Sequence, residues 1–274
     1  MKALDTKGTL EMLLENKNAI IYGAGGAVGG AIARVFAREG AKVFLTGRHL
    51  ETVDIVAHDI SQGGGVAETA QVDVLDEDAV EKHISEVAKK AGAVDISFNA
   101  IGIPQQGIQG IPLAELSVDS FALPITTYTT AQFLTARAAA RRMVAKGSGV
   151  ILMHTPEPAR LGVPLVGGMA PAWAAMEAFS RSLSAELGPH GIRAICLRST
   201  GIPETAAFNV VLGLHAKAMG STRQQFQSLV ESMSHRRRST TLLELANVAA
   251  FMASDQARAM TGTVANLTGG IIVD

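Results

Sequence analysis

The stretch AIIYGAGGAVGGAIARVFAREGAKVFLTGR, residues 19–48, decides the fold of this chain. A short apolar run at 19–22 leads into a turn crowded with glycines. An amphipathic helical pattern at 29–39 then leads to a second apolar run at 42–46. Strand, glycine-rich turn, helix and strand in this order are typical of the first unit of a parallel sheet that binds phosphate groups at the turn. The stretch therefore predicts an α/β fold.

The alternation of strand and helix continues along the chain. Further apolar runs predict strands at 67–72, 94–98, 150–154, 194–197 and 263–267. Amphipathic patterns predict helices at 50–62, 77–91, 121–146, 172–187 and 242–253. The early strands lack a clear polar alternation, as expected where helices cover both faces of a parallel sheet. We therefore predict a Rossmann-like, doubly wound parallel sheet of about seven strands with helices on both faces.

Composition narrows the class of protein. Of the 274 residues 47% are hydrophobic and the formal net charge is −1, so we expect a filled globular core and no nucleic-acid partner. No apolar run approaches a membrane span and the N-terminus is too polar for a signal peptide, which predicts a cytoplasmic protein with no membrane contact. The lone cysteine excludes an internal disulfide, and no metal site is predicted. We expect a single domain over 1–274 with an N-terminal extension at 1–13.

The glycine-rich turn and the end of the second strand predict a nicotinamide dinucleotide site. Residues in the turn that are expected to approach the pyrophosphate are Gly23, Gly25, Gly26, Val28 and Gly29. After the second strand, Arg48 and His49 follow a glycine where NAD-selective proteins carry an acid for the ribose 2′-hydroxyl. An arginine suits a 2′-phosphate, so we expect NADP(H). The alternatives are a tight turn without a ligand and an arginine that is merely exposed.

By these motifs the chain resembles the short-chain dehydrogenase/reductase family from about residue 14 to its C-terminus. The family's T-G-x-x-x-G-x-G motif falls on Tyr22, Gly23, Ala27 and Gly29, so its threonine and second glycine are replaced. The stretches RSLSAELGPHGIR (181–193) and MASDQARAMTGTVANLTGG (252–270) are similar to the family's sixth-helix and C-terminal signatures.

The resemblance implies further contacts with the cofactor and substrate. The family's adenine-contacting aspartate matches Asp73, which Val74 follows, and its N-N-A-G motif appears as Asn99-Ala100-Ile101-Gly102. Thr205 matches the place where family members contact the cofactor diphosphate. The segment 201–241 corresponds to the family's substrate lid, and its apolar residues suit a cover over a cleft.

The resemblance also implies four catalytic positions, and all four carry other residues. The family's asparagine, serine, tyrosine and lysine fall on Tyr128, Pro156, Met169 and Trp173. The other tyrosine is Tyr22, and the only lysine after Lys146 is Lys217, so no small shift in alignment restores the pair. Methionine donates no proton and an indole N–H is a poor acid, so any carbonyl reduction here needs other groups.

Three side chains near the vacated positions are candidate replacements: Tyr128, His154 and Thr155. Strand alternation points His154 the same way as Pro156, and a histidine that titrates near neutrality could donate a proton. Tyr128 could reach the pocket with its hydroxyl. Thr155 and Glu157, which flank Pro156, could hydrogen-bond a substrate or simply lie on a surface loop. The alternatives for the other two are a packed histidine and a tyrosine that fills volume. Trp173 is either packing or a face for a flat or cationic substrate.

Two functions follow. The first is an NADP(H)-dependent oxidoreductase with a non-standard site that transfers hydride to an imine, an activated alkene or a carbonyl of a small-molecule substrate. The second is a non-catalytic NADP(H)-binding sensor or structural partner. We favour the first because aromatic and titratable residues stand at the vacated positions. On either interpretation the small residues in the helices at 121–146 and 172–187 favour a homodimer or homotetramer.

Overall fold

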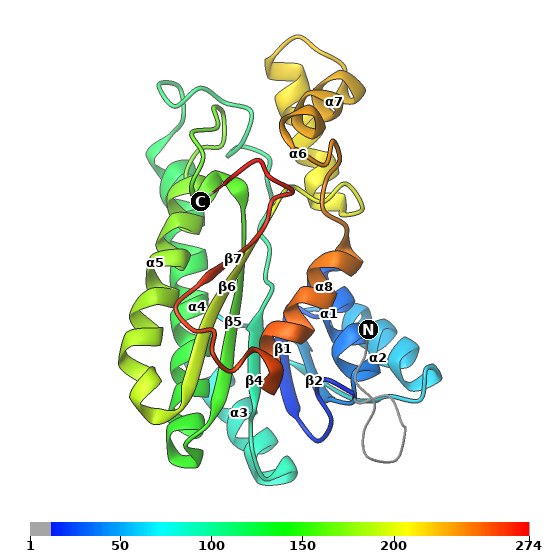
Figure 1. Ribbon diagram of the computed structural model, residues 1–274. Helices are drawn as coiled ribbons and strands as arrows, with labels where there is room; N and C mark the ends of the chain where they lie inside the picture. Colours follow the sequence, from blue (N-terminus) through cyan, green and yellow to red (C-terminus); the bar gives the residue numbers. More distant parts are fainter. Residues whose placement is uncertain (1–11, 274) are drawn as a thin grey trace.

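The architecture is a single seven-stranded parallel sheet between two layers of helices, seen in a computed structural model that describes residues 12–273 (Figure 1). The strands are β1 (Asn18–Tyr22), β2 (Lys42–Gly47), β3 (Val66–Gln71), β4 (Ile96–Asn99), β5 (Gly149–Pro156), β6 (Ile192–Ser199) and β7 (Val264–Leu267). The helices are α1 (Ala27–Arg38), α2 (Leu50–Gln62), α3 (Glu77–Ala91), α4 (Val118–Lys146), α5 (Met169–Leu187), α6 (Ala206–Ala218), α7 (Arg223–Met233) and α8 (Leu242–Ala253). Short 3₁₀ turns lie at Glu157–Ala159, Gly188–His190 and Asp255–Ala257.

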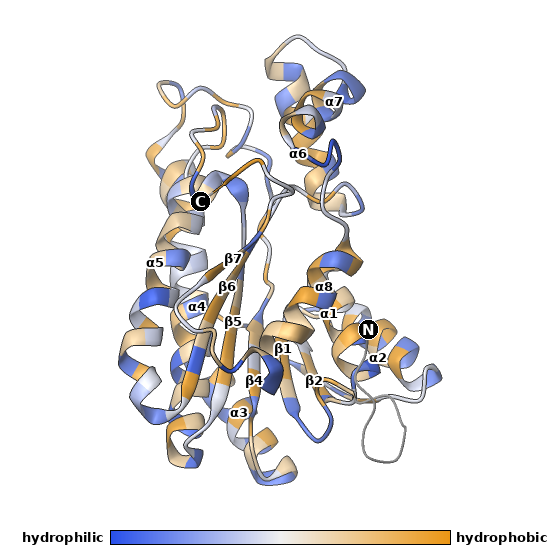
Figure 2. Cartoon of the chain, in the orientation of Figure 1, coloured by the Kyte–Doolittle hydropathy of each residue, from blue (hydrophilic) through white to orange (hydrophobic). Residues whose placement is uncertain are grey.

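Helices cover both faces of the sheet. Helices α1, α2 and α8 pack on one face and α3, α4 and α5 on the other (Figure 1). Each layer has its own buried apolar cluster, with Phe36 in the first and Met143 in the second. In Figure 2 the strands are predominantly hydrophobic, whereas the helices mix hydrophobic and hydrophilic residues. The predicted fold class, a doubly wound parallel sheet of about seven strands, is confirmed.

The order of the strands places a crevice at the middle of one sheet edge. The order is β3-β2-β1-β4-β5-β6-β7, so β1 lies between β2 and β4. The chain adds β2 and β3 on one side of β1 and then crosses over to add β4 to β7 on the other side. Tyr22, the last residue of β1, is level with Thr46 of β2 and Asn99 of β4. The segments that follow these strands therefore emerge at one edge, which is where ligands bind in sheets of this type.

Several helices differ from the sequence-based expectation. Helix α5 begins at Met169 instead of 172, and α1 begins at Ala27 instead of 29. Helix α4 begins at Val118 instead of 121, because the Ser117 side chain accepts a hydrogen bond from the Ser120 backbone N–H and caps it. Helix α7 was not predicted, since its sequence RQQFQSLVESM has no wide apolar stripe. The signal present is a capping box, in which Thr222 and Gln225 satisfy each other's backbone N–H groups.

Two further predictions concern the N-terminus of the chain and its contact with a membrane. The predicted N-terminal extension at 1–13 lies outside the described residues except for positions 12 and 13. Among residues 12–273 no helix is long and apolar enough to span a membrane.

A buried ion pair ties helix α5 to strand β6. The Arg198 guanidinium donates to both carboxylate oxygens of Glu177, at 2.7 and 2.5 Å, and both side chains are 5% exposed. The Thr155 hydroxyl donates to Glu177 Oε1 at 2.9 Å. Because the two charges are desolvated together, removing either one leaves the other uncompensated in the interior.

We therefore expect Glu177→Gln to lower the free energy of unfolding by about 3–5 kcal/mol. The matched control is Glu81→Gln, which removes an ion pair with Arg141 at the surface, where 57% of the arginine side chain is exposed. That variant is expected to lose less than about 1 kcal/mol because water screens the pair. Urea denaturation of both variants measures the difference. Equal losses would show that the buried pair contributes no more to the free energy of unfolding than the exposed pair.

Candidate active site

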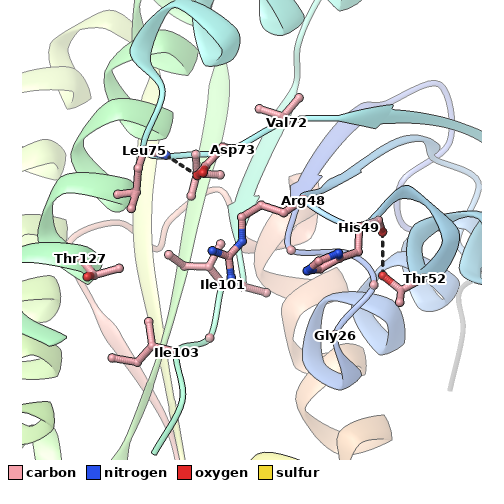
Figure 3. Close-up of a pocket in the computed structure, with 16 residues that line it drawn as sticks. Gly26, Arg48, His49, Thr52, Val72, Asp73, Leu75, Ile101, Ile103 and Thr127 are labelled. Atoms are coloured by element: carbon pink, nitrogen blue, oxygen red, sulfur yellow. Dashed lines mark hydrogen bonds between the residues drawn. The ribbon is translucent and has the colours of Figure 1, made fainter. Parts of the chain in front are cut away.

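The ends of β1 to β4 surround a cavity of about 220 Å³. The turn after β1 contributes Gly23, Gly25 and Gly26, the end of β2 contributes Gly47, Arg48 and His49, and the segment after β3 contributes residues 72–75. The turn after β4 completes the wall with residues 100–103 (Figure 3). We call this space the first cavity.

The glycines are required by the geometry of the turn after β1. Gly23 has φ +73°, in the left-handed region that favours glycine. A Cβ on Gly29 would lie 2.4 Å from the Gly23 carbonyl oxygen, and one on Gly25 would lie 2.1 Å from Thr52 Oγ1. Gly26 is the N-cap of α1, and no side chain of the described residues caps this helix. Because no described side chain caps it, the N-terminus of α1 leaves backbone N–H groups free at the crevice, where Gly26 lines the first cavity. Such an arrangement fits a diphosphate.

Arg48 supplies a positive charge at the rim of the first cavity. Its side chain extends from the end of β2 toward Ile101 (Figure 3). It forms no ion pair with any residue in 12–273, and only its backbone carbonyl is engaged, by Gln71 Nε2 at 2.9 Å. The end of β2 contributes no acidic side chain to the cavity wall. An arginine at this place could pair with a phosphate group of a dinucleotide.

Three of the other predicted cofactor residues line the first cavity, and a fourth lies behind its wall. Asp73, Val74 and Ala100 line the first cavity, and the Asp73 carboxylate accepts the Leu75 backbone N–H at 3.0 Å. Asn99 does not line it and is buried: its amide donates to Ala131 O and Thr135 Oγ1, and its carbonyl accepts the Ile101 N–H. Asn99 therefore shapes the turn and lies behind the wall, and its contact with a cofactor stays a prediction.

Gly29, Val28 and Thr205 do not line the first cavity, and their contact with a cofactor stays a prediction. Gly29 permits the close approach of α1 to the turn and is absent from the wall of the first cavity. Val28 and Thr205 line a neighbouring cavity instead. The Thr205 hydroxyl caps α6, accepting the Phe208 N–H at 3.2 Å and donating to Ile202 O at 2.9 Å.

This neighbouring space, the second cavity, has a volume of about 200 Å³ and adjoins the first one at Gly102, which lines both. The structure brings the four positions implied by the resemblance to its wall, together with one of the candidate replacements: Tyr128, Pro156, Met169, Trp173 and His154. Helix α6 of the predicted lid segment covers it with Phe208 and Val211.

His154 lines the second cavity, as strand alternation predicts, but it is a poor proton donor. Burial lowers its pKa from 6.5 to about 4, so the ring is neutral near pH 7. The Ser199 hydroxyl donates to Thr200 O at 2.8 Å, so its oxygen accepts from His154 Nε2–H at 2.8 Å. The proton of the neutral ring is therefore committed to Ser199. The expectation of a histidine that titrates near neutrality is wrong.

The other two candidates are also poorly suited to proton donation. Tyr128 lines the second cavity, and burial raises its pKa to about 12 despite a backbone hydrogen bond from Ile103 that lowers it. Thr155 is fully buried, points to Glu177 on the other side of β5 and does not line the cavity. Neither of the alternatives set out for it, a substrate contact or a position on a surface loop, agrees with this placement.

Glu157, which the sequence suggested only as a possible hydrogen-bonding partner of a substrate, is the acid of the second cavity. It follows β5 directly and lines the second cavity, and its Oε2 is buried with no hydrogen-bond partner among the described residues. Burial raises its pKa from 4.5 to about 7, and backbone hydrogen bonds from Glu157 and Gly201 offset this only in part. A position one residue after the vacated serine was the available signal. Its burial depends on the segment after β6, which the local sequence does not reveal.

Comparison with known proteins agrees with this architecture. A family model described as enoyl-(acyl carrier protein) reductase matches residues 23–271. The chain belongs to the short-chain dehydrogenase/reductase family. It is 29% identical over 259 residues to the uncharacterized oxidoreductase YxbG of Bacillus subtilis (strain 168), covering 94% of this chain and 92% of that protein. The chain is accordingly an oxidoreductase of this family by relationship.

Solved structures of the same family superpose over nearly the whole chain. An NAD⁺-bound xylitol dehydrogenase has a TM-score of 0.88 at 25% identity, covering 94% of this chain and 99% of that one. A gluconate 5-dehydrogenase from Burkholderia cenocepacia J2315, in complex with NADP and tartrate, has a TM-score of 0.83 at 25% identity, covering 95% and 97%. Relatives of this fold thus bind either form of the nicotinamide cofactor.

The raised pKa of Glu157 makes a prediction about stability. Below pH 4.5 the carboxyl is protonated in both the folded and the unfolded chain, whereas above its folded pKa of about 7 the folded state must carry a buried charge. Stability is therefore lost as pH rises through this window. We expect Glu157→Gln to be more stable than the wild type by on the order of 3 kcal/mol at about pH 8, a gain that vanishes near pH 4.5.

Urea denaturation of the wild type and Glu157→Gln at both pH values measures this gain. Glu115→Gln, which removes an exposed acid on the loop before α4, is the control and is expected to show no such pH dependence. A pH-independent difference for Glu157→Gln would contradict the assignment.

Proposed function

We propose that this chain is an NADP(H)-dependent oxidoreductase with a non-standard active site, acting in the cytoplasm on a small imine, activated alkene or carbonyl compound. The observation that carries the proposal is the pair of adjoining cavities that share Gly102. The first has the glycine turn, free helix N-terminus and arginine that a dinucleotide phosphate needs. The second is enclosed by apolar and aromatic side chains, which suit a small organic substrate.

The roles of the chain's residues follow from this division. Gly23, Gly25 and Gly26 would let the diphosphate approach the N-terminus of α1, and Arg48 would pair with the 2′-phosphate. Asp73 and Val74 would border the adenine. A bound nicotinamide supplies or takes up a hydride. Phe208, Val211 and Trp173 would exclude water from the substrate, since all three line the second cavity.

The non-standard character of the site is part of the proposal. Met169 and Trp173, in the first turn and a half of α5, line the second cavity where the family alignment places tyrosine and lysine. Pro156 and Tyr128 occupy the positions of the serine and the asparagine. The family's proton relay would then be missing, and the substrate would have to be one that needs little help from those groups.

The cofactor preference gives the next prediction. We expect Arg48→Ala to weaken NADPH binding roughly 10- to 100-fold, the worth of a charge-assisted hydrogen bond, and to leave NADH binding nearly unchanged. Fluorescence titration of the purified protein with both cofactors measures this. Arg141→Ala, on the far half of α4 and paired with Glu81, is the control. Equal losses for NADPH and NADH would mean that Arg48 does not read the 2′-phosphate.

Turnover is tested by a hydride-transfer screen with cyclic imines, enones and ketones. Consumption of NADPH with any of the three classes supports the oxidoreductase. Tight NADPH binding without turnover in all three would instead favour a non-catalytic sensor or structural partner. Failure to bind either cofactor would overturn both functions.

We also propose that the chain forms homodimers or homotetramers through α4 and α5. Apolar side chains on α4 are exposed, including Phe133 at 46% and Val144 at 38%, and the Phe133 ring lies 6.2 Å from the ring of Phe179 on α5. Light scattering at micromolar concentration should give a multiple of the chain mass, and Phe133→Glu should shift the protein toward the monomer. A monomeric wild type would contradict the proposal.

A further inference from the structure

Glu157 is the only charged side chain among the described residues that line the second cavity. The other titratable groups in the wall are His154 from β5 and Tyr128 from α4, while α5 and α6 contribute none. Burial keeps His154 neutral and Tyr128 protonated near pH 7, because their pKa values are about 4 and about 12. The cavity therefore offers Glu157 no cation.

The carboxyl of Glu157 is incompletely satisfied. Hydrogen bonds from the backbone N–H groups of Glu157 and Gly201 reach the carboxyl, yet its Oε2 is buried and has no partner in residues 12–273. A buried carboxyl oxygen without a partner keeps an uncompensated desolvation penalty, so a ligand that donates a hydrogen bond to it or carries a positive charge relieves that penalty. Among the described residues, the wall of the second cavity lacks a basic nitrogen that could pair with this carboxyl, and a ligand could supply one.

Aromatic side chains complete the environment for such a nitrogen. Trp173 and Tyr128 line the same cavity as Glu157 and present π systems that attract cations. No lysine or arginine of the described residues lines it, so nothing repels a positive charge. A carbonyl or an enone carries no positive charge for the carboxylate and the aromatic rings to attract, whereas a protonated imine does.

We propose that Glu157 is the proton donor and counter-ion for a substrate that carries a basic imine nitrogen in the second cavity. This inference rests on the proposed oxidoreductase function and narrows its three substrate classes to one.

The proton and electron pairs balance in two steps. The Glu157 carboxylic acid gives its proton to the imine nitrogen lone pair, which forms an iminium ion beside a carboxylate. The iminium carbon then accepts a hydride, for which the reductant is a reduced nicotinamide, and the C=N π pair becomes the nitrogen lone pair of the amine. Glu157 regains a proton from solvent as the amine leaves. The net reaction consumes one imine, one proton and one reduced nicotinamide.

The first experiment uses binding alone and needs no turnover. Calorimetry with 2-methylpyrrolidine, the saturated cation that mimics the product, should show binding to the wild type at about pH 8. Binding to Glu157→Gln should be at least about 10-fold weaker, because the charge-assisted contact is lost. The neutral ring cyclopentanone should not distinguish the two proteins. Equal amine binding by both would overturn the inference.

The second experiment separates proton donation from charge pairing. With 2-methyl-1-pyrroline, kcat/KM should fall about 100-fold or more in Glu157→Gln, the usual worth of a positioned acid. With the N-methylated pyrrolinium, which needs no proton, kcat should be retained while KM rises. Glu157→Asp keeps a carboxyl and should recover part of the imine activity. A purely structural role would impair both substrates alike and would overturn the inference.

The pH profiles of the two substrates should slope in opposite directions. Above about pH 7 the imine reaction should slow as Glu157 loses its proton, whereas kcat/KM for the permanent cation should rise as the carboxylate forms. Glu115→Gln, outside the cavity, should match the wild type within about twofold in every assay, since surface changes are usually small.

The outcomes also separate the inference from the proposed function. Turnover of enones or ketones that is unaffected by Glu157→Gln would leave the oxidoreductase standing and overturn the role of Glu157. Amine binding that depends on Glu157, with no turnover of any class, would overturn the oxidoreductase and retain the cation site.

Discussion

The approach of helix α1 to the end of strand β1 sets the geometry of the whole ligand edge. A Cβ on Gly29 would come within 2.4 Å of the Gly23 carbonyl oxygen, so the helix can begin this close to the strand only because position 29 lacks a side chain. That contact aims the N-terminus of α1 into the crevice between β1 and β4. The turns after β2, β3 and β4 then form its remaining walls, because the parallel register brings their ends level.

A second constraint acts on the other half of the edge, where successive side chains of β5 point to opposite faces of the sheet. Thr155 faces the buried pair of Glu177 and Arg198, and its neighbour His154 faces the second cavity. The ion pair fixes α5 against β6 and thereby positions Met169 and Trp173 at the start of α5. The chemistry of the cavity thus depends on a salt bridge that no ligand touches.

The fold was readable from the sequence because its signals are local. Glycine spacing, apolar runs and helical periodicity predicted the strands and most helices, and alternation along β5 placed His154 toward the cavity. Protonation states were not readable, because they depend on distant segments. Ser199, which forms a hydrogen bond with His154 Nε2, is 45 positions away, and Gly201 helps to enclose Glu157. The partners of the Asn99 amide nitrogen, Ala131 and Thr135, likewise lie in α4, which the sequence around Asn99 does not reveal.

The negative charge that Glu157 brings to the second cavity favours a cationic imine as the substrate. On the proposed alignment, the position now held by Trp173 would carry a lysine, whose positive charge suits the developing negative charge on a carbonyl oxygen and repels an iminium. Exchanging that cation for an indole, and placing a carboxyl beside the vacated serine, reverses the electrostatic preference of the cavity. A carboxylic acid can also protonate an imine and then stabilise the cation that it has made. A neutral methionine and a phenol with a pKa of about 12 can do neither at pH 7.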